Sequence, residues 1–239
     1  MLTIVPTPIG NMRDITLRAL DALKDADCIA CEDTRHSGRL LQHFEIKKPL
    51  LSFHEHSTEN KRVEILDRLG RGENVALISD AGMPLISDPG FDLVRAALER
   101  GIKVEVLPGA QAAVTALVAS GLAPDAFAFL GFLPQKAQKR KKEIERVSGY
   151  EETLIFYESP YRLAKSLADL FEVLGNREAA VARELTKKFE EVARGTLAQL
   201  LEKFSKREAK GEIVIVVAGA GRKKLYSAKQ EDEEDQSEL

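Results

Sequence analysis

The chain has 239 residues, of which 44% are hydrophobic and 31% charged, and its formal net charge is −3. This length allows two compact domains or one large one. No apolar run approaches the ~20 residues that a membrane-spanning helix needs, and residues 2–5 have the pattern of a strand rather than of a signal peptide. We therefore expect a cytoplasmic protein without membrane association.

The first half of the chain alternates short apolar runs with amphipathic stretches. Strands are predicted at 2–6, 27–31, 49–53, 74–79 and 102–107. Helices are predicted between them at 14–25, with Asp14 as N-cap, at 34–44 after Asp33, at 58–70, and at 88–100, with Pro89 in the first turn. This alternation indicates a mostly parallel sheet with helices on both faces.

The second half begins with a helix of small residues at 110–120. Further strands are predicted at 126–133, 153–157, 178–183 and 212–218, and helices at 137–147, 160–174 and 196–208. We therefore predict an α/β fold of two lobes, residues 1–112 and 113–225.

The last residues, 226–239, form a separate acidic segment. Six acidic residues and one lysine give this segment a charge of −5, which leaves +2 on residues 1–225 out of the total of −3. A charge run of this kind is typical of a disordered, solvated tail. The mildly basic remainder of the chain permits nucleic acid as a partner.

Three strands of the first lobe end in loops rich in glycine, proline and aspartate. These loops are residues 6–11, 79–90 and 108–111. Ligands of open α/β sheets bind where strands end in such loops. The buried strand fixes the position of its loop, and glycine lets the backbone approach the ligand closely. The three loops therefore predict one composite pocket.

Two features suggest a metal or redox site but have a simpler structural explanation. Cys28 and Cys31 have the C-x-x-C spacing of a redox pair or of half a zinc site. A zinc site needs about four ligands, and the sequence has no second C-x-x-C pair. The small apolar neighbours of these cysteines favour a buried strand. His54 and His56 alone are likewise a poor metal site, so we expect no metal.

Charged side chains follow two further strands. Glu32, Asp33 and Arg35 come after the strand at 27–31. Asp33 is best explained as the N-cap of the next helix, whereas Arg35 is equally consistent with phosphate binding and with a solvated side chain. Glu184 and Lys187 follow the strand at 178–183. This pair could transfer a proton or hold a phosphate, or form only a salt-bridged turn.

Residues 136–142 hold five basic side chains in seven positions. Such a run can bind the phosphates of a nucleic acid. Most charge runs are exposed helix faces, however, and no aromatic residues are interleaved here to stack on bases. Three nucleotide or hydrolase motifs are missing from the sequence, namely G-x-x-x-x-G-K-[ST], G-x-S-x-G and G-x-G-x-x-G.

Taken together, the motifs resemble a known family. The segments Val5–Asn11, Glu32–Arg35, Ser79–Gly90, Pro108–Ala110 and Arg183–Lys187 are similar to the tetrapyrrole methylase-like superfamily. Within it they are most similar to the ribosomal RNA small subunit methyltransferase I group, over about residues 1–222. Met83 stands where that group most often has threonine.

The resemblance implies two α/β lobes with S-adenosylmethionine bound in the cleft between them, in a homodimer. It also implies methyl transfer to the 2′-hydroxyl of a cytidine in the decoding region of 16S rRNA, within the small ribosomal subunit and without a metal. The cofactor residues that it implies are Pro8, Ile9, Asp80, Met83, Ile86, Pro108, Gly109, Gln111 and Ala112, with Tyr157 from the second lobe.

Residues that could accept the ribose proton or stabilise its oxygen lie at the ends of strands. These catalytic candidates are Glu32, Asp33, His54, Glu184 and Lys187. The candidates for RNA contacts are Arg35, Lys136, Lys139, Arg140, Lys141 and Lys142. Two alternatives stay open, a methyltransferase that acts on a tetrapyrrole and a non-catalytic RNA-binding factor of ribosome assembly.

Overall fold

A computed structural model of the protein describes residues 1–54 and 59–221. The predictions for His56 and for the acidic tail at 226–239 fall outside the described residues. The chain divides into two compact units. The first consists of Met1–Thr115 together with Glu184–Glu190, and the second of Ala116–Arg183 and the described residues 191–221. The segment Glu184–Glu190 therefore lies within the second predicted lobe by sequence but belongs to the first unit.

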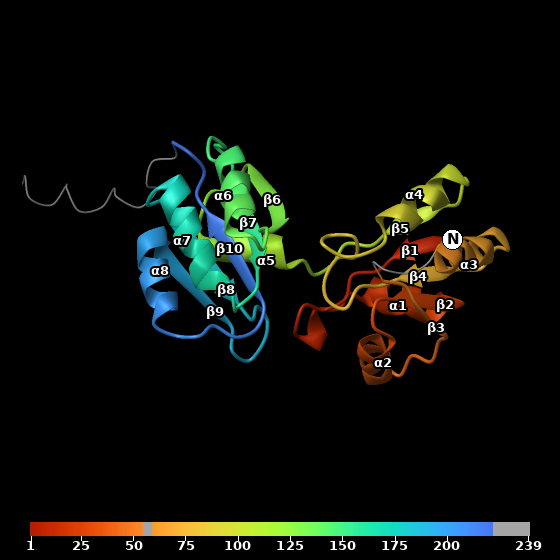
Figure 1. Cartoon of the computed structure of the whole chain (residues 1–239). Helices are drawn as coiled ribbons and strands as arrows, with labels where there is room; N and C mark the ends of the chain where they lie inside the picture. Colours follow the sequence, from red (N-terminus) through yellow and green to blue (C-terminus); the bar gives the residue numbers. More distant parts are fainter. Residues whose placement is uncertain (55–58, 222–239) are drawn as a thin grey trace, which may run out of the picture. The chain divides into compact units, whose positions relative to one another are not determined.

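The first unit contains a five-stranded parallel sheet with the strand order β3-β2-β4-β1-β5 (Figure 1). Its strands are β1 (Leu2–Ile4), β2 (Cys28–Cys31), β3 (Leu50–Ser52), β4 (Val75–Leu77) and β5 (Val104–Val106). The helices that follow the first four strands are α1 (Leu17–Asp25), α2 (Thr34–His43), α3 (Glu59–Gly70) and α4 (Phe91–Glu99). Helix α5 (Ala112–Ser120) follows β5 and crosses from the first unit into the second at residue 116.

Apolar side chains from both faces of this sheet form two cores. On one face, Leu23 of α1 and Leu41 of α2 pack with Ile29. On the other face, Leu66 of α3 and Leu93 of α4 pack against the sheet. The predicted parallel sheet with helices on both faces is confirmed.

The two cysteines lie on opposite faces of the sheet. Cys28 belongs to the core beneath α3 and α4, and Cys31 belongs to the core beneath α1 and α2. Both side chains are fully buried, and burial raises the pKa of each thiol. Residues three apart on a strand point to opposite sides, so this C-x-x-C spacing belongs to a packed strand, as the sequence indicated.

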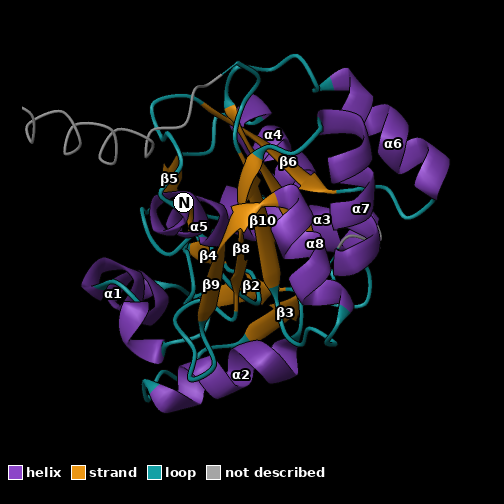
Figure 2. Ribbon diagram, turned by 90° about the vertical axis from the view of Figure 1, so that its left-hand side faces the viewer, coloured by secondary structure: helices purple, strands orange, loops and turns teal. Residues whose placement is uncertain are grey.

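The second unit contains a mixed five-stranded sheet with the order β6-β7-β10-β8-β9. Its elements are β6 (Phe127–Phe132), α6 (Ala137–Arg146), β7 (Thr153–Glu158), α7 (Leu163–Leu174), β8 (Glu178–Arg183), β9 (Glu191–Thr196), α8 (Leu197–Ser205) and β10 (Ile213–Val217). Figure 2 shows α7 beside α6 and α8. Apolar residues of the three helices share one core with the strands.

Three details of the elements differ from the sequence predictions. Thr16 rather than Asp14 caps α1, because its side chain accepts the hydrogen bond of the Ala19 N–H. Helix α4 begins at Phe91 after Gly90, so Pro89 precedes it. Strand β9 was not predicted. It pairs in antiparallel fashion with β8 at the edge of the sheet, and its glutamate, arginine and glycine obscure the apolar alternation of a strand.

Within the described residues, none of the helices combines the length and the apolar character that crossing a membrane requires.

Candidate functional site

Three loops at the carboxyl ends of strands in the first unit hold one another in place. The N–H groups of Thr7 and Gly82 each donate to the carbonyl of the other, over 2.9 and 3.0 Å. The Thr7 hydroxyl also donates to the Ser79 carbonyl over 3.1 Å. Thr7 is 2% exposed and Ser79 3%, so these bonds are shielded from water. They join the loop after β1 to the loop after β4.

Two glycines allow the loop after β5 to join the same cluster. A β-carbon at Gly109 would lie only 2.6 Å from Cβ of Pro6, and one at Gly82 would lie 3.2 Å from Cγ2 of Ile9 and 3.6 Å from the Ala110 carbonyl oxygen. Gly82 also has a positive φ of 86°, which favours glycine. The predicted convergence of the three loops is therefore observed within the first unit.

The loop after β4 is held in an unfavourable backbone conformation. Leu85 and Ser87 have φ values of 72° and 65°, a region that residues with a side chain rarely adopt. Residues held in this way cost about 1–3 kcal/mol each and concentrate at ligand sites. The strain is a reason to treat residues 79–90 as part of a site rather than as a simple connection.

Carboxylates gather where β2 and β4 end. The Asp33 N–H donates to Oδ1 of Asp80 over 3.3 Å, and this bond joins the loop after β2 to the loop after β4. Burial, together with the charges of Glu32 and Asp80, raises the pKa of the half-buried Asp88 to about 6. Asp88 lies within the Ser79–Gly90 motif, but its surroundings could not be read from the sequence, because the residues around it come from two different loops.

The Asp88→Asn variant is expected to be more stable than the parent above about pH 6. The carboxyl pKa is higher in the folded protein than in the unfolded chain, so folding is disfavoured once Asp88 is ionised. We expect a gain of about 1–2 kcal/mol in unfolding free energy near pH 8, which disappears below about pH 4. Urea unfolding of parent and variant between about pH 4 and pH 8 measures this gain. A gain that does not vary with pH would contradict the raised pKa of Asp88.

The connection between β8 and β9 supplies a fourth loop to this cluster, Glu184–Glu190. The Asn11 N–H donates to Oγ1 of Thr186 over 3.0 Å. A β-carbon at Gly10 would clash with the aliphatic part of the Lys187 side chain. Sequence reasoning missed Thr186 as an anchor, because its partner lies 175 residues away.

Glu184 and Lys187 form an ion pair inside this loop. Lys187 Nζ lies 2.9 Å from Oε1 of Glu184, and their side chains are 28% and 18% exposed. The φ values of Glu184 and Thr186 are 53° and 65°, so the turn itself is strained. The sequence left open a chemical pair and a salt-bridged turn. The structure shows the salt bridge and also shows that the pair is docked beside Gly10.

The predicted cofactor residues are divided between the two units. The nine predicted cofactor residues of the first lobe all lie in or next to the three converging loops of the first unit, whereas Tyr157 lies on β7 of the second unit, against Phe129 and Phe132. His54 is exposed just after β3. Gln111 caps α5 by accepting the Val114 N–H over 2.8 Å.

Asp33 is engaged as the N-cap of α2, where it accepts the N–H groups of Arg35 and His36. The Arg35 guanidinium also bonds to it and lowers the pKa of Asp33 to about 2. Such a weak base is poorly suited to accept a proton near neutral pH. The side chain of Arg35 remains 87% exposed and can still reach a phosphate.

Comparison with known proteins identifies the family. The family model of the tetrapyrrole (corrin/porphyrin) methylases matches residues 1–201. The chain belongs to the tetrapyrrole methylase family. This finding confirms the resemblance that the loop motifs indicated.

Individual members of the family cover nearly the whole chain. This chain is 49% identical over 222 residues to ribosomal RNA small subunit methyltransferase I of Halalkalibacterium halodurans. The match covers 93% of this chain and 77% of that protein. The protein of the same name from Bacillus subtilis is 47% identical over 236 residues, and the match covers 99% of this chain and 79% of that protein. The crystal structure of the methyltransferase CobJ matches with a TM-score of 0.69 at 19% sequence identity. The match covers 94% of this chain and 96% of the CobJ chain. This last similarity shows the fold alone.

The run at 136–142 behaves differently in this tetrapyrrole methylase from what its charge suggested. Arg140 is only 5% exposed. It donates to Oδ2 of Asp169 over 2.7 Å and to the Gln135 carbonyl over 3.0 Å. Lys141 is 2.7 Å from Glu172. Arg140 is therefore a structural residue that cannot contact RNA, while Lys136, Lys139 and Lys142 are exposed.

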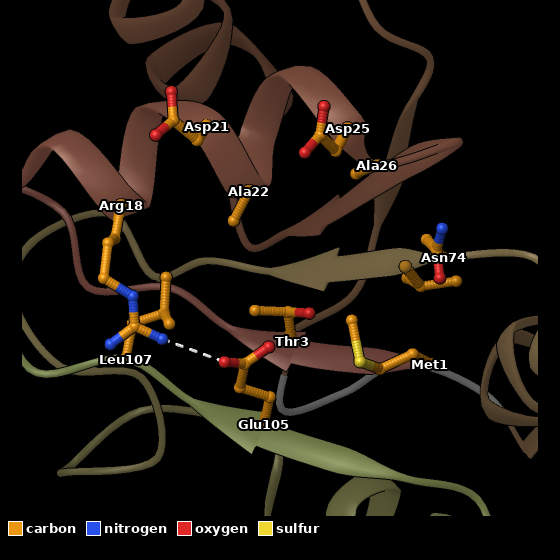
Figure 3. A pocket seen from close by; sticks show the side chains of 11 residues that line it. Met1, Thr3, Arg18, Asp21, Ala22, Asp25, Ala26, Asn74, Glu105 and Leu107 are labelled. Carbon is orange, nitrogen blue, oxygen red and sulfur yellow. Dashed lines mark hydrogen bonds and ion pairs between the residues drawn. The ribbon is translucent and has the colours of Figure 1, made fainter.

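A hollow of about 410 Å³ lies away from the loops that the family motifs mark. Figure 3 shows Arg18, Asp21 and Asp25 of α1 on one side of it and Thr3 on the other. Arg18 spans it in an ion pair with Glu105 at 2.9 Å. None of its lining residues belongs to the predicted site of the methylase, so we assign it no role in the reaction.

Proposed function

We propose that this protein transfers a methyl group from S-adenosylmethionine to ribosomal RNA of the small subunit, at the 2′-hydroxyl of a cytidine in the decoding region of 16S rRNA. The similarity of 47–49% to ribosomal RNA small subunit methyltransferase I over more than nine-tenths of the chain carries this proposal. The convergent loops of the first unit support it independently. We further propose that the enzyme acts in the cytoplasm as a homodimer.

The chemistry of the converging loops fits the proposed cofactor. Gly109 and Gly82 let the loops pack closely, because a β-carbon at either position would meet Pro6 or Ile9 of a neighbouring loop. The carboxylates of Asp80 and Asp88 lie in the same cluster. Carboxylates of this kind can accept hydrogen bonds from ribose hydroxyls and favour a positive charge nearby. The contact of Tyr157 with the cofactor stays a prediction.

S-adenosylmethionine, when bound, supplies a methyl group attached to a positively charged sulfur. The protein has to hold the ribose oxygen in line with that methyl group, and such positioning can supply several kcal/mol of the barrier reduction, up to about 7–11 kcal/mol. Loops that are joined by buried hydrogen bonds at Thr7, Ser79 and Gly82 are suited to this task. The strained backbone at Leu85 and Ser87 indicates that the fold imposes the conformation of the loop after β4.

The reaction also requires the ribose 2′-hydroxyl to lose its proton. Lys187 can place its ammonium group beside the oxygen and stabilise the developing negative charge. Glu184 orients that ammonium from 2.9 Å and can accept the proton. We therefore favour this pair over Asp33, whose lowered pKa makes it a weak base. The target nucleotide has to be unpaired or splayed for its ribose to enter the site.

Labelled S-adenosylmethionine tests the proposed function directly. The protein is incubated with small ribosomal subunits from cells that lack this methylation, and the position of the label is mapped. We expect label on the 2′-oxygen of one cytidine of 16S rRNA. Label that enters only an added tetrapyrrole would replace this proposal by the small-molecule alternative, and failure to bind S-adenosylmethionine in calorimetry would favour a non-catalytic factor.

The Lys187→Met variant is expected to slow single-turnover methyl transfer by about 10²–10³-fold. Methionine keeps the aliphatic contact with Gly10 but removes the charge, so the affinity for S-adenosylmethionine should change little. Glu184→Gln should act in the same direction. Lys24→Met, on the exposed surface of α1, is the control and should react like the parent. Equal single-turnover rates for Lys187→Met and the parent would rule out the proposed role of Lys187.

A further inference from the structure

The loop Glu184–Glu190 exposes an aromatic ring beside a cation. Phe189 is 66% exposed, and Nζ of Lys188 lies 5.6 Å from the centre of its ring. Single exposed apolar residues are common on protein surfaces and need no explanation on their own. The distinctive feature here is the combination of an exposed ring, a neighbouring lysine and a position in the loop that carries Glu184 and Lys187.

The ring is carried by a preorganised turn. The Thr186 N–H donates to Oε2 of Glu190 over 2.6 Å, and the Glu190 N–H donates to the Lys187 carbonyl over 3.1 Å. These two bonds close the chain around Phe189. Leu185, in the same turn, is 7% exposed and fixes it to the protein interior. A ring on a backbone that is already fixed loses less conformational entropy when a ligand stacks on it than a ring on a flexible segment would.

The turn is also fixed next to the proposed reaction site. Thr186 bonds to Asn11, and the Lys187 side chain lies against Gly10. Phe189 follows Lys187 by two residues and is displayed from the loop that carries the proposed catalytic pair. A nucleotide neighbouring the target ribose would therefore be within reach of this ring.

We propose that Phe189 and Lys188 form a stacking platform for an unpaired base of the RNA substrate, next to the nucleotide that is methylated. This inference rests on the proposed function. Unpaired bases stack on aromatic side chains, and a nearby ammonium attracts the phosphate. Every base has a π-face, so the platform tolerates different sequences. It also supplies the aromatic contact that is missing from residues 136–142.

The absence of tryptophan from the whole sequence makes a direct optical test possible. Phe189→Trp introduces a single fluorophore at the platform, and Phe91→Trp introduces one at a matched position in the same unit, where Phe91 is 65% exposed. Both full-length variants are titrated with single-stranded oligocytidylate RNA. We expect quenching in Phe189→Trp and unchanged emission in Phe91→Trp. Equal quenching in both, or none in either, would overturn the platform.

Kinetics with small ribosomal subunits provide the second readout. Phe189→Ala should raise the KM for subunits by about 5- to 150-fold, because a stacked base contributes about 1–3 kcal/mol. Calorimetry should give an unchanged Kd for S-adenosylmethionine. Phe189→Tyr should retain most of the parent's KM, and Phe91→Ala should match the parent.

The outcomes separate this inference from the proposed function. Label transfer by the parent with an unchanged KM in Phe189→Ala overturns the platform alone. Loss of the dimer in Phe189→Ala, seen by sedimentation, would overturn it in favour of a protein contact. A parent that leaves the RNA unlabelled overturns both proposals.

Discussion

Replacing Gly109 by alanine is expected to weaken binding of S-adenosylmethionine by about 10- to 100-fold, or about 1.4–2.8 kcal/mol. The added β-carbon would lie 2.6 Å from Cβ and 2.9 Å from Cγ of Pro6. A proline ring cannot rotate away, so the loops after β1 and β5 must separate. Overpacking of this kind costs about 1–3 kcal/mol. Since both loops belong to the proposed cofactor site, we expect cofactor affinity to fall together with stability.

Calorimetric titration with S-adenosylmethionine measures the change. Gly70→Ala is the matched control, because a β-carbon at Gly70 meets no atom within 4 Å and the residue ends α3 in the same unit. That variant should bind the cofactor like the parent and be equally stable or slightly more stable. If Gly109→Ala bound the cofactor as tightly as Gly70→Ala did, the loop after β5 would not be part of the binding site.

Replacing Asp169 by alanine is expected to lower the free energy of unfolding by about 3–5 kcal/mol. Asp169 and Arg140 form a buried ion pair, with side chains 11% and 6% exposed. The substitution would leave the Arg140 charge in the core of the second unit without its carboxylate, which is more costly than the loss of the contact itself. Urea unfolding followed by circular dichroism measures the effect.

A neighbouring pair provides the control for this prediction. Glu172 is 2.7 Å from Lys141, but its side chain is 63% exposed, so Glu172→Ala should cost less than about 1 kcal/mol. Replacing both Arg140 and Asp169 by apolar residues should recover most of the stability that the single variant loses. A small, equal loss in Asp169→Ala and Glu172→Ala would show that the Arg140 charge is not confined in the core.

The Arg140 result illustrates where charge patterns mislead. Five basic residues in seven positions made residues 136–142 a candidate for RNA contacts, beside the simpler interpretation as an exposed helix face. The segment forms the start of α6, and a helix turns its residues to different sides. Arg140 consequently points inward to Asp169 of α7, while Lys139 and Lys142 stay exposed. The composition of a run does not specify which of its members will be buried.

Two errors in the predicted secondary structure, at the start of α1 and at β9, have identifiable causes. Asp14 and Thr16 are both good N-cap residues, and the choice of Thr16 depended on which one could bond to the N–H of the third helical residue. Strand β9 has little alternation of its own and is stabilised by pairing with β8. Both outcomes depend on the backbone geometry of neighbouring segments, which the residue pattern leaves undetermined.

The sequence alone was enough to predict the α/β class, the parallel arrangement of the first sheet and the strand ends where the loops of the proposed site converge. It could do so because buried parallel strands require continuous apolar runs and short loops of glycine and proline. The family resemblance was equally accessible, since it rests on contiguous motifs such as Ser79–Gly90.

The packing of the folded chain set which distant groups meet. It placed the turn of Glu184–Glu190 within the first unit, where Thr186 bonds to Asn11. It also put Asp88 among the carboxylates that, with burial, raise its pKa to about 6. Hydrogen bonds, close glycine contacts and shifts in pKa depend on distances of a few ångströms between segments far apart in the chain. Those distances are set by the packing of the whole unit, so local residue patterns cannot supply them.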